Sequence, residues 1–230
     1  MSKYINIAYK ILYKCSSRKV KRNLKLLKHG WSLMVSPDSW LVSSGYVKSF
    51  LSSEMLSQEG EPLPWMNYSV IDFLNRHLKK DILVFEYGSG SSTLFFSRKV
   101  KNITSVEYDT NWYERISSRI AKENLLNVDY IYCPLGDAYV NAIFDRNDMF
   151  DLVVVDGRTR EKCAIAALEK LSANGVLLLD DSNRKEYANI FKYYSKNGFS
   201  SLTFSGLKPM GFGTEFTTIF YKKMQNCLNI

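Results

Sequence analysis

Residues 82–93 read ILVFEYGSGSST, a short apolar run followed by two glycines and a series of small hydroxyl side chains. The apolar run predicts a buried strand, and the residues from Ser91 onward predict a helix. Gly88 and Gly90 therefore fall in a strand-to-helix turn, where they permit a close backbone approach to a ligand. The amides that open such a helix can hold a carboxylate or a phosphate. The turn alone does not distinguish a ligand site from a structural turn.

The chain on both sides of this stretch alternates short apolar strands with helices. The predicted strands are Ile82–Tyr87, Ile103–Val106, Val128–Cys133, Phe150–Val155 and Gly175–Leu179, followed by Ser201–Phe204 and Glu215–Tyr221. Strands separated by helices indicate parallel βαβ units with right-handed crossovers. We therefore predict an α/β fold with a doubly wound, Rossmann-like sheet.

The net charge of +8 over 230 residues suggests a nucleic-acid binder until the charges are placed along the chain. Residues 1–30 hold nine lysines and arginines and no acidic side chain, whereas the remaining residues hold 22 basic and 23 acidic side chains. The body of the protein is thus nearly neutral. Nucleic acid is an unlikely partner on this count, and the excess charge belongs to an N-terminal arm.

Three regions are predicted, namely a basic amphipathic helical arm over 1–30, a helical and loop cap over 31–80, and a ligand-binding domain over 81–230. The arm can lie on an anionic membrane surface. It can also dock on the body or on a partner chain, which the sequence favours. The sequence does not indicate the oligomeric state.

The expected location is cytoplasmic, with peripheral contact at the inner face of the membrane if the arm binds lipid. No apolar run of transmembrane length and no export signal is evident in the sequence. Four cysteines lie far apart without a CxxC pair, which predicts free thiols.

Polar groups follow the predicted parallel strands, and ligands of doubly wound sheets bind at those carboxyl ends. Glu107, 17 positions beyond Gly90, can accept both hydroxyls of a ribose. The later strands end near further acidic groups, which are Asp137 (beside Ala138), Asp156, and Asp180 with Asp181. Such a cluster attracts a cation and repels a phosphate-rich ligand. The pattern therefore favours a sulfonium cofactor over a pyrophosphate cofactor.

Two departures from other motifs support that choice. No Gly-Lys-Ser/Thr sequence is present, which excludes a P-loop. The dinucleotide fingerprint would have glycine or alanine at position 93, where Thr93 stands. Glu86, two residues before Gly88, is placed to hold the amino group of an amino acid.

Together, Glu86-x-Gly88-x-Gly90, Glu107, Gly136-Asp137-Ala138 and Asp156 resemble the class I S-adenosylmethionine-dependent methyltransferases. The resemblance implies S-adenosylmethionine as the cofactor of residues 81–230, and a mostly parallel sheet whose last strand is antiparallel. Residues 64–73, 86–93, 155–158 and 179–182 are also similar to uncharacterised bacterial methyltransferases that accompany surface-polysaccharide functions. That similarity associates the chain with polysaccharide biosynthesis.

The resemblance also implies a role for each matching position. The turn residues Glu86, Tyr87, Gly88, Ser89, Gly90 and Ser91 would hold the methionine moiety. Glu107 would bind the ribose hydroxyls, with Tyr108 beside the adenine. Asp137 would accept from the adenine amino group, with Ala138 packed nearby. Asp156 would lie near the methyl group and the acceptor.

Transfer of a methyl group to a hydroxyl requires that the hydroxyl proton be removed. His29 and His77 are the two histidines of the chain, and both are predicted to lie at the surface. This leaves Asp156 and Asp181 as candidate bases.

A metal ion is the other way to activate the acceptor. Some O-methyltransferases of this class hold a divalent cation at places comparable to Asp156, Asp180 and Asp181, although their pattern has asparagine where Asp181 stands. Oxygen ligands of this kind suit Mg²⁺ or Mn²⁺. The alternative is that Asp181 or Ser182 caps the helix expected near Asn183.

The sequence thus predicts methyl transfer from S-adenosylmethionine to a hydroxyl of a small molecule or a glycan. Two alternatives stay open, which are a non-catalytic binding or scaffold subunit that keeps the fold and an NAD-dependent oxidoreductase. Arg158 and Arg160 can bind an anionic group of the acceptor or pair with Asp180 or Asp181.

Overall fold

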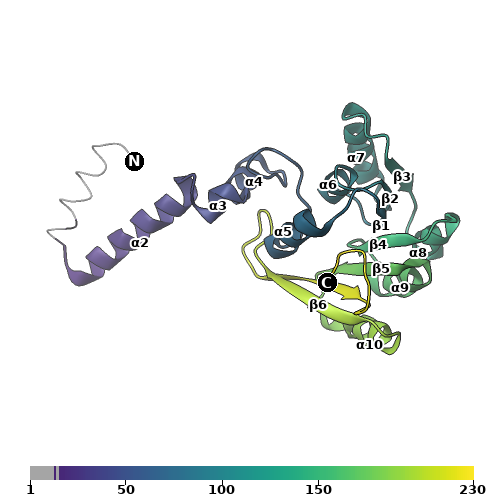
Figure 1. The fold of residues 1–230 in the computed structure, drawn as a ribbon. Coiled ribbons are helices and arrows are strands. Elements are labelled where there is room, and N and C mark those ends of the chain that lie inside the picture. The colour runs from purple at the N-terminus through teal and green to yellow at the C-terminus, as the bar shows by residue number, and fades with distance from the viewer. Residues whose placement is uncertain (1–12, 14–15) are drawn as a thin grey trace. The chain divides into compact units, whose positions relative to one another are not determined.

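A computed structural model describes Tyr13 and residues 16–230 of the chain (Figure 1). The chain divides into two compact units, one ending at Gly60 and the other spanning Glu61–Ile230. Each unit is considered by itself. Of the helical arm predicted over residues 1–30, residues 1–12 and 14–15 lie outside the described residues.

The first unit holds α2 (Arg18–Val35), α3 (Trp40–Ser43) and α4 (Tyr46–Ser52). α2 starts after Ser17, where the apolar periodicity of the sequence is interrupted. Gly45 precedes α4 with a φ of 84°, and a Cβ atom there would lie 2.3 Å from the carbonyl oxygen of Leu56. A glycine is therefore required where the segment after α4 folds back against the start of the helix. Within the described residues, no helix combines the length and apolar character needed to cross a bilayer.

The described residues of the second unit form a seven-stranded sheet in the order β3-β2-β1-β4-β5-β7-β6. Its strands are β1 (Leu83–Tyr87), β2 (Asn102–Glu107), β3 (Val128–Tyr132), β4 (Phe150–Val155), β5 (Leu171–Asp180), β6 (Ser200–Gly206) and β7 (Glu215–Tyr221). The first five strands pair in parallel, and β7 runs antiparallel to both β5 and β6. The predicted Rossmann-like sheet with an antiparallel last strand is confirmed.

Helices cover both faces of this sheet. They are α5 (Tyr68–His77), α6 (Ser91–Ser97), α7 (Thr110–Lys122), α8 (Asp137–Asn141), α9 (Arg160–Ala167) and α10 (Ala188–Lys196), with 3-10 helices at Ala142–Asp145, Leu168–Lys170 and Lys185–Tyr187. α5, which the sequence analysis groups with the cap, belongs to the second unit. The short helix α8 was not predicted.

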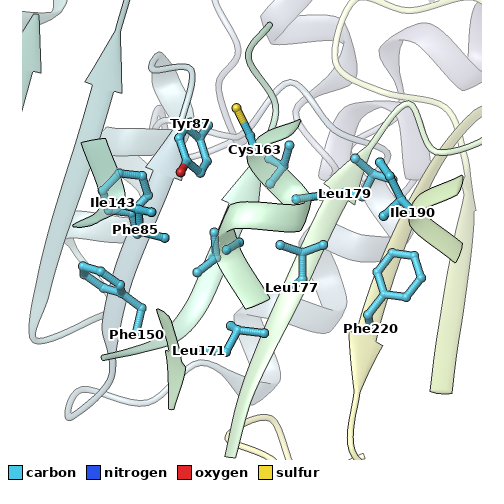
Figure 2. Packing of buried hydrophobic residues seen from close by; sticks show 14 of the residues in the cluster. Phe85, Tyr87, Ile143, Phe150, Cys163, Leu171, Leu177, Leu179, Ile190 and Phe220 are labelled. Atoms are coloured by element: carbon cyan, nitrogen blue, oxygen red, sulfur yellow. The ribbon is translucent and has the colours of Figure 1, made fainter. Parts of the chain in front are cut away.

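The main hydrophobic core lies between the sheet and the helices α8, α9 and α10 (Figure 2). Alternate strand residues point into it, among them Phe85 and Tyr87 of β1 and Leu177 and Leu179 of β5. Because side chains alternate along a strand, Glu86 of β1 must point to the opposite face, toward α6. This alternation decides which residues of the glycine motif can reach a ligand.

Candidate active site

The turn after β1 is held in place by groups from three neighbouring elements. The backbone N–H and the hydroxyl of Ser89 both donate to Oε2 of Glu107, at 2.9 and 2.8 Å. Trp112 of α7 donates its indole N–H to the carbonyl oxygen of Ser89 at 2.8 Å. The Ser89 hydroxyl also lies 2.7 Å from the hydroxyl of Tyr130 in β3. The turn is thus preorganised by hydrogen bonds to the chain itself.

Glu107 ends β2 and is almost fully buried. Its second oxygen, Oε1, accepts from the backbone N–H groups of Tyr108 and Asp109, both at 2.9 Å. A carboxylate offers about four acceptor positions, so this one is fully used. Glu107 lies where the sequence analysis places it, and it ties the loop after β2 to the turn after β1.

Glu86 lies beneath the turn, with no accessible surface. Its Oε2 accepts from the hydroxyls of Thr93 at 2.5 Å and Ser105 at 2.7 Å, whereas Oε1 has no hydrogen-bond partner among the described residues. Burial raises the pKa of Glu86 to about 7. Glu86 therefore supports the turn from below, and contact between its unpaired Oε1 and the amino group of a ligand stays a prediction.

Thr93, which stands where the dinucleotide fingerprint has glycine or alanine, forms two hydrogen bonds in the turn. Its hydroxyl donates to Glu86 and accepts from the backbone N–H of Gly90 at 3.1 Å. A glycine or alanine at this position would leave the Gly90 N–H without this acceptor. From the sequence, Thr93 is only a mismatch to that fingerprint, and its function in the turn follows from the structure.

The loops after β1 and β4 touch at two glycines. A Cβ atom on Gly88, whose φ is 88°, would lie 2.5 Å from the Cα atom of Gly157. A Cβ atom on Gly90 would meet only ordinary contacts, the nearest at 3.7 Å from Trp112. The first glycine of the motif is thus required by the fold, whereas the second is not.

Tyr87 contributes only its backbone to this end of the sheet. Its carbonyl oxygen accepts from the N–H of Asp156 at 3.0 Å. Its ring is buried in the core, and its hydroxyl donates to the carbonyl oxygen of Val140 at 2.7 Å (Figure 2). The Tyr87 side chain therefore packs in the core, and a contact between Tyr87 and the methionine moiety would have to come from its backbone. Ser91, the first residue of α6, is buried as well.

Arg160 joins the ends of β4 and β5. Its guanidinium group pairs with Asp156 at 2.9 Å and with Asp181 at 3.3 Å, and it donates to the carbonyl oxygens of Asp156, Gly157 and Asp180. The side chain is nearly buried. Of the two roles left open by the sequence, Arg160 takes the structural one.

The carboxylates at these strand ends resist ionisation. Burial, together with the nearby charge of Asp180, raises the pKa of Asp156 well above its ordinary value, although Arg160 acts in the opposite direction. Burial likewise raises the pKa of Asp180 to about 6. Asp156, whose side chain is 21% exposed, is therefore a carboxylate with a raised affinity for a proton at the end of β4.

The predicted metal site does not form. Asp156 and Asp181 both pair with Arg160, whose positive charge lies where a divalent cation would need to bind, and Oδ1 of Asp180 accepts from Thr217 at 2.6 Å. No group of three histidine, cysteine, aspartate or glutamate side chains in the described chain could hold a metal ion. The prediction of Mg²⁺ or Mn²⁺ at Asp156, Asp180 and Asp181 is not supported.

The capping alternative is also wrong. The next helix begins at Lys185 without a side-chain cap, and the Ser182 hydroxyl accepts from Thr218 at 2.8 Å. Asp181 adopts a φ of 50° and pairs with Arg184 as well as Arg160. Asp181 is thus engaged by two arginines, and Ser182 is engaged by Thr218 of β7.

The residues predicted to contact adenine lie at the ends of β2 and β3. Tyr108 is half-buried and packs edge-on against Tyr139, with ring centroids 6.2 Å apart. Its hydroxyl accepts from Nε of the exposed Arg158 at 3.1 Å. This bond spans the end of β1, which lies between β2 and β4 in the sheet. Asp137 and Ala138 open α8 and are exposed.

A further group lies beside the end of β5. The Trp65 side chain is half-exposed, and its indole N–H donates to the carbonyl oxygen of Pro209 at 3.0 Å. The Lys208 ammonium lies 4.2 Å from the centre of the Trp65 ring and acts electrostatically on Asp180. Lys208 was missed by the sequence analysis, because the loop between β6 and β7 carries no recognisable motif.

The histidines lie elsewhere. His77 stacks on Phe73 at the end of α5, and its Nδ1 lies 2.6 Å from the carbonyl oxygen of Leu228. His29 is an exposed residue of α2. Among the described residues, the contacts of His77 are with Phe73 and Leu228, away from the carboxylates described above, which leaves Asp156 as the candidate base with the most suitable environment.

Similarity to proteins of known structure is clear, although no protein-family model and no curated protein sequence matches the chain. The O-methyltransferase TomG from Streptomyces achromogenes, solved with S-adenosylmethionine, has a TM-score of 0.53 at 13% identity, covering 85% of this chain and 96% of TomG. A putative methyltransferase from Streptococcus mutans, solved with S-adenosylhomocysteine, has a TM-score of 0.52 at 16% identity, covering 65% and 94%.

An rRNA methylase from Streptococcus thermophilus has a TM-score of 0.51 at 14% identity, covering 66% of this chain and 92% of the methylase. These proteins differ in what their names say they act on, so the likeness identifies an architecture. At such identities the shared feature is the fold. The chain has the fold of the class I S-adenosylmethionine-dependent methyltransferases.

Proposed function

We propose that the protein binds S-adenosylmethionine at the carboxyl ends of β1, β2 and β4 and transfers its methyl group to a hydroxyl of a small molecule or a glycan. The observation that carries this proposal is the buried acidic cluster beside the glycine turn. Asp180, Asp181 and Glu86 all act electrostatically on Asp156. A negative field of this kind favours a sulfonium over the pyrophosphate of a dinucleotide.

Glu107 can accept a hydrogen bond from the ribose of this cofactor if one of its present donors turns away. All acceptor positions of Glu107 are in use, but the Ser89 hydroxyl has Tyr130 as a second partner at 2.7 Å. If Ser89 turns its proton to Tyr130, an acceptor position on Oε2 becomes free for a ribose hydroxyl. Ser89 and Glu107 then each keep a partner, while the Tyr130 hydroxyl changes from donor to acceptor, which limits the cost of the exchange.

The adenine and the methionine moiety of the cofactor are proposed to lie along the same edge of the sheet. Tyr108 and Asp137 lie at the ends of neighbouring strands, where an aromatic face and an acceptor suit adenine. The backbone of the turn from Gly88 to Gly90 is the surface that faces the methionine moiety. Glu86 supports this turn from below through Thr93.

The bound cofactor supplies an electrophilic methyl group on its sulfonium. Asp156 accepts the proton of the acceptor hydroxyl at one carboxylate oxygen, while Arg160 fixes the other part of the side chain. The raised pKa of Asp156 matches this task, because a base of ordinary aspartate pKa is too weak near neutral pH. Asp181 is the weaker candidate, since it pairs with two arginines.

A glycan or another ring-shaped acceptor is supported by Trp65. Its half-exposed ring lies in the same unit as Asp180, and Lys208 links the two electrostatically. Aromatic faces bury the apolar faces of sugar rings and of planar small molecules. In the sheet, β1 and β4 lie between β2 and β5. An acceptor held by Trp65 near β5 would therefore lie on one side of the acidic cluster, and the adenine near β2 would lie on the other.

Calorimetry with S-adenosylmethionine and, separately, with NAD tests the cofactor. Binding of the first at micromolar concentrations is expected. Its absence would contradict the proposal, and tight binding of NAD alone would support an oxidoreductase instead.

The reaction is tested with cofactor labelled in its methyl group and a panel of sugars, nucleotide sugars and polysaccharides. The label is expected to resist mild alkali, as a methyl ether does, whereas loss in alkali would indicate a methyl ester. The D156N variant should bind the cofactor and lose at least about 100-fold in transfer rate. Cofactor binding without transfer to any acceptor would support a non-catalytic subunit.

A further inference from the structure

α2 is an amphipathic helix whose two faces differ sharply in chemistry. At 100° per residue, one set of apolar side chains falls within a sector of about 100°. This set, called the apolar face below, consists of Val20, Leu24, Leu27, Trp31, Met34 and Val35. The side chains that surround it are mostly basic. An apolar stripe of this width normally packs against something.

None of the described residues of the first unit buries this face. No residue of α2 is buried, and the side chains of Leu27 and Trp31 are 70% and 57% exposed. Exposed apolar residues are ordinary when they are scattered, but a contiguous stripe marks an interaction surface. The face therefore requires a partner that accepts apolar side chains.

The charges of α2 indicate which partner fits. Lys21 and Lys28 flank the apolar face, and the remaining basic residues, Arg18, Lys19, Arg22 and Lys25, lie on the opposite side. The helix contains no acidic residue, and the first in the chain is Asp38. Cations that border an apolar stripe match the anionic headgroups and acyl boundary of a lipid bilayer.

Two other partners fit less well. The second unit carries 21 basic and 20 acidic side chains, so it has almost no net charge to attract a helix with six cations. A second copy of α2 would bring two such sets of cations together, at a cost in electrostatic repulsion. An anionic bilayer is the partner that satisfies both faces.

We propose that α2 lies parallel to an anionic membrane surface, with its apolar face inserted at the boundary between headgroups and acyl chains. Lys21 and Lys28 then meet the headgroups on one flank. Trp31 lies on the inserted face, where an indole ring buries its apolar surface and keeps its N–H near water. This proposal does not rest on the proposed methyl transfer, and it concerns a different unit of the chain.

Flotation of the full-length protein with vesicles tests the proposal. Binding is expected to vesicles of phosphatidylcholine containing about one third phosphatidylglycerol, and not to phosphatidylcholine alone. Binding should weaken when the salt concentration is raised to about 0.5 M, because headgroup charges are then screened. Absence of binding to the anionic vesicles would overturn the proposal.

Two pairs of leucines in the same helix provide a matched comparison. The double variant L24S/L27S removes side chains from the apolar face and should lower the partition coefficient at least about tenfold. The double variant L26S/L33S removes two exposed leucines that lie outside this face and should change it less than about twofold. Equal effects of the two variants would contradict insertion of the proposed face.

Charge is tested with K21Q/K25Q/K28Q, which should bind about 100-fold more weakly, since each cation near an anionic surface contributes about fivefold. Sedimentation velocity and thermal unfolding without vesicles test the other partners. Dissociation of a dimer by L24S/L27S would assign the face to a second copy and overturn the proposal. A lower melting temperature of the second unit in the same variant would assign the face to that unit, with the same consequence.

Discussion

Glu107 accepts two hydrogen bonds from Ser89, one from its backbone N–H at 2.9 Å and one from its hydroxyl at 2.8 Å. Without any ligand, the carboxylate therefore has a structural role: it holds the glycine turn against the end of β2. The backbone N–H bond can persist when a ribose binds, whereas the hydroxyl bond must be exchanged. The two residues should consequently respond very differently to substitution.

The substitution S89A should leave the affinity for S-adenosylmethionine within about threefold of the parent, because it removes a competitor for Oε2 and keeps the backbone N–H. The substitution E107A should lower that affinity about 100-fold or more, since hydrogen bonds to a charged acceptor contribute about 1.5–3 kcal/mol each. Calorimetry measures both, with circular dichroism as the check on folding. Unchanged affinity in E107A would refute the assignment of Glu107 to the ribose.

The two glycines of the motif should differ in their effect on stability. G88A places a methyl group against the backbone of Gly157 at a positive φ, and we expect a loss of at least about 2 kcal/mol in the free energy of unfolding. G90A meets only ordinary contacts and should cost less than about 1 kcal/mol. Urea denaturation compares them, and equal losses would show that the turn is not packed as described.

Glu86 should make the folded state less stable as the pH rises. Its pKa is about 7 in the folded protein against 4.5 ordinarily, so between these values the folded state binds more protons than the unfolded state. Stability therefore falls from pH 4.5 to 7, by up to about 3 kcal/mol from this residue. The E86Q variant resembles the protonated form and should be more stable than the parent at pH 8 and similar at pH 5.

The matched control for this experiment is E114Q, which makes the same chemical change at an exposed position of α7. It should leave the pH dependence of unfolding unchanged. A parent protein as stable at pH 8 as at pH 5, or an E86Q variant less stable than the parent at pH 8, would contradict the raised pKa.

Arg160 should not tolerate lysine. Its guanidinium group reaches Asp156, Asp181 and three carbonyl oxygens at once, whereas one ammonium cannot satisfy all of them. We expect R160K to lose about 3 kcal/mol of stability, since it leaves buried charge poorly paired.

The exposed Arg158 supplies the control for that change. R158K should change the stability by less than about 0.5 kcal/mol. Thermal unfolding at pH 7 measures both, and a similar melting temperature for the two lysine variants would show that Arg160 does not join the strand ends.

The central strands β1 and β4 could be predicted closely from the sequence because their apolar runs are buried on both faces. Phe150–Val155 and Glu215–Tyr221 are predicted to the residue, and β1 begins one residue later than predicted. α8 was missed because five residues are too few to show a helical period. β5 begins four residues before the predicted Gly175, since a glycine within a strand is a poor guide to where the strand starts.

For the site, the sequence indicated the right strand ends but not which side chains are already engaged. Glu86 and Glu107 are equivalent in a motif search, yet alternation along β1 buries Glu86 against α6. The partners of Arg160 depend on how β4 and β5 lie beside each other, which residue spacing does not report. Thr93 carried a usable signal, since a hydroxyl three residues after Gly90 can cap the turn.

The antiparallel return of β7 has a consequence for how the protein is made. The contacts that hold the glycine turn join residues 18 positions apart, as Ser89 and Glu107 do. Those on the Trp65 side join residues 144 and 150 positions apart, from Trp65 to Pro209 and from Asn67 to Thr217. During synthesis on the ribosome the cofactor side can therefore assemble early, whereas the Trp65 side must wait for nearly the whole chain. A nascent chain would reach cofactor competence well before it could engage an acceptor.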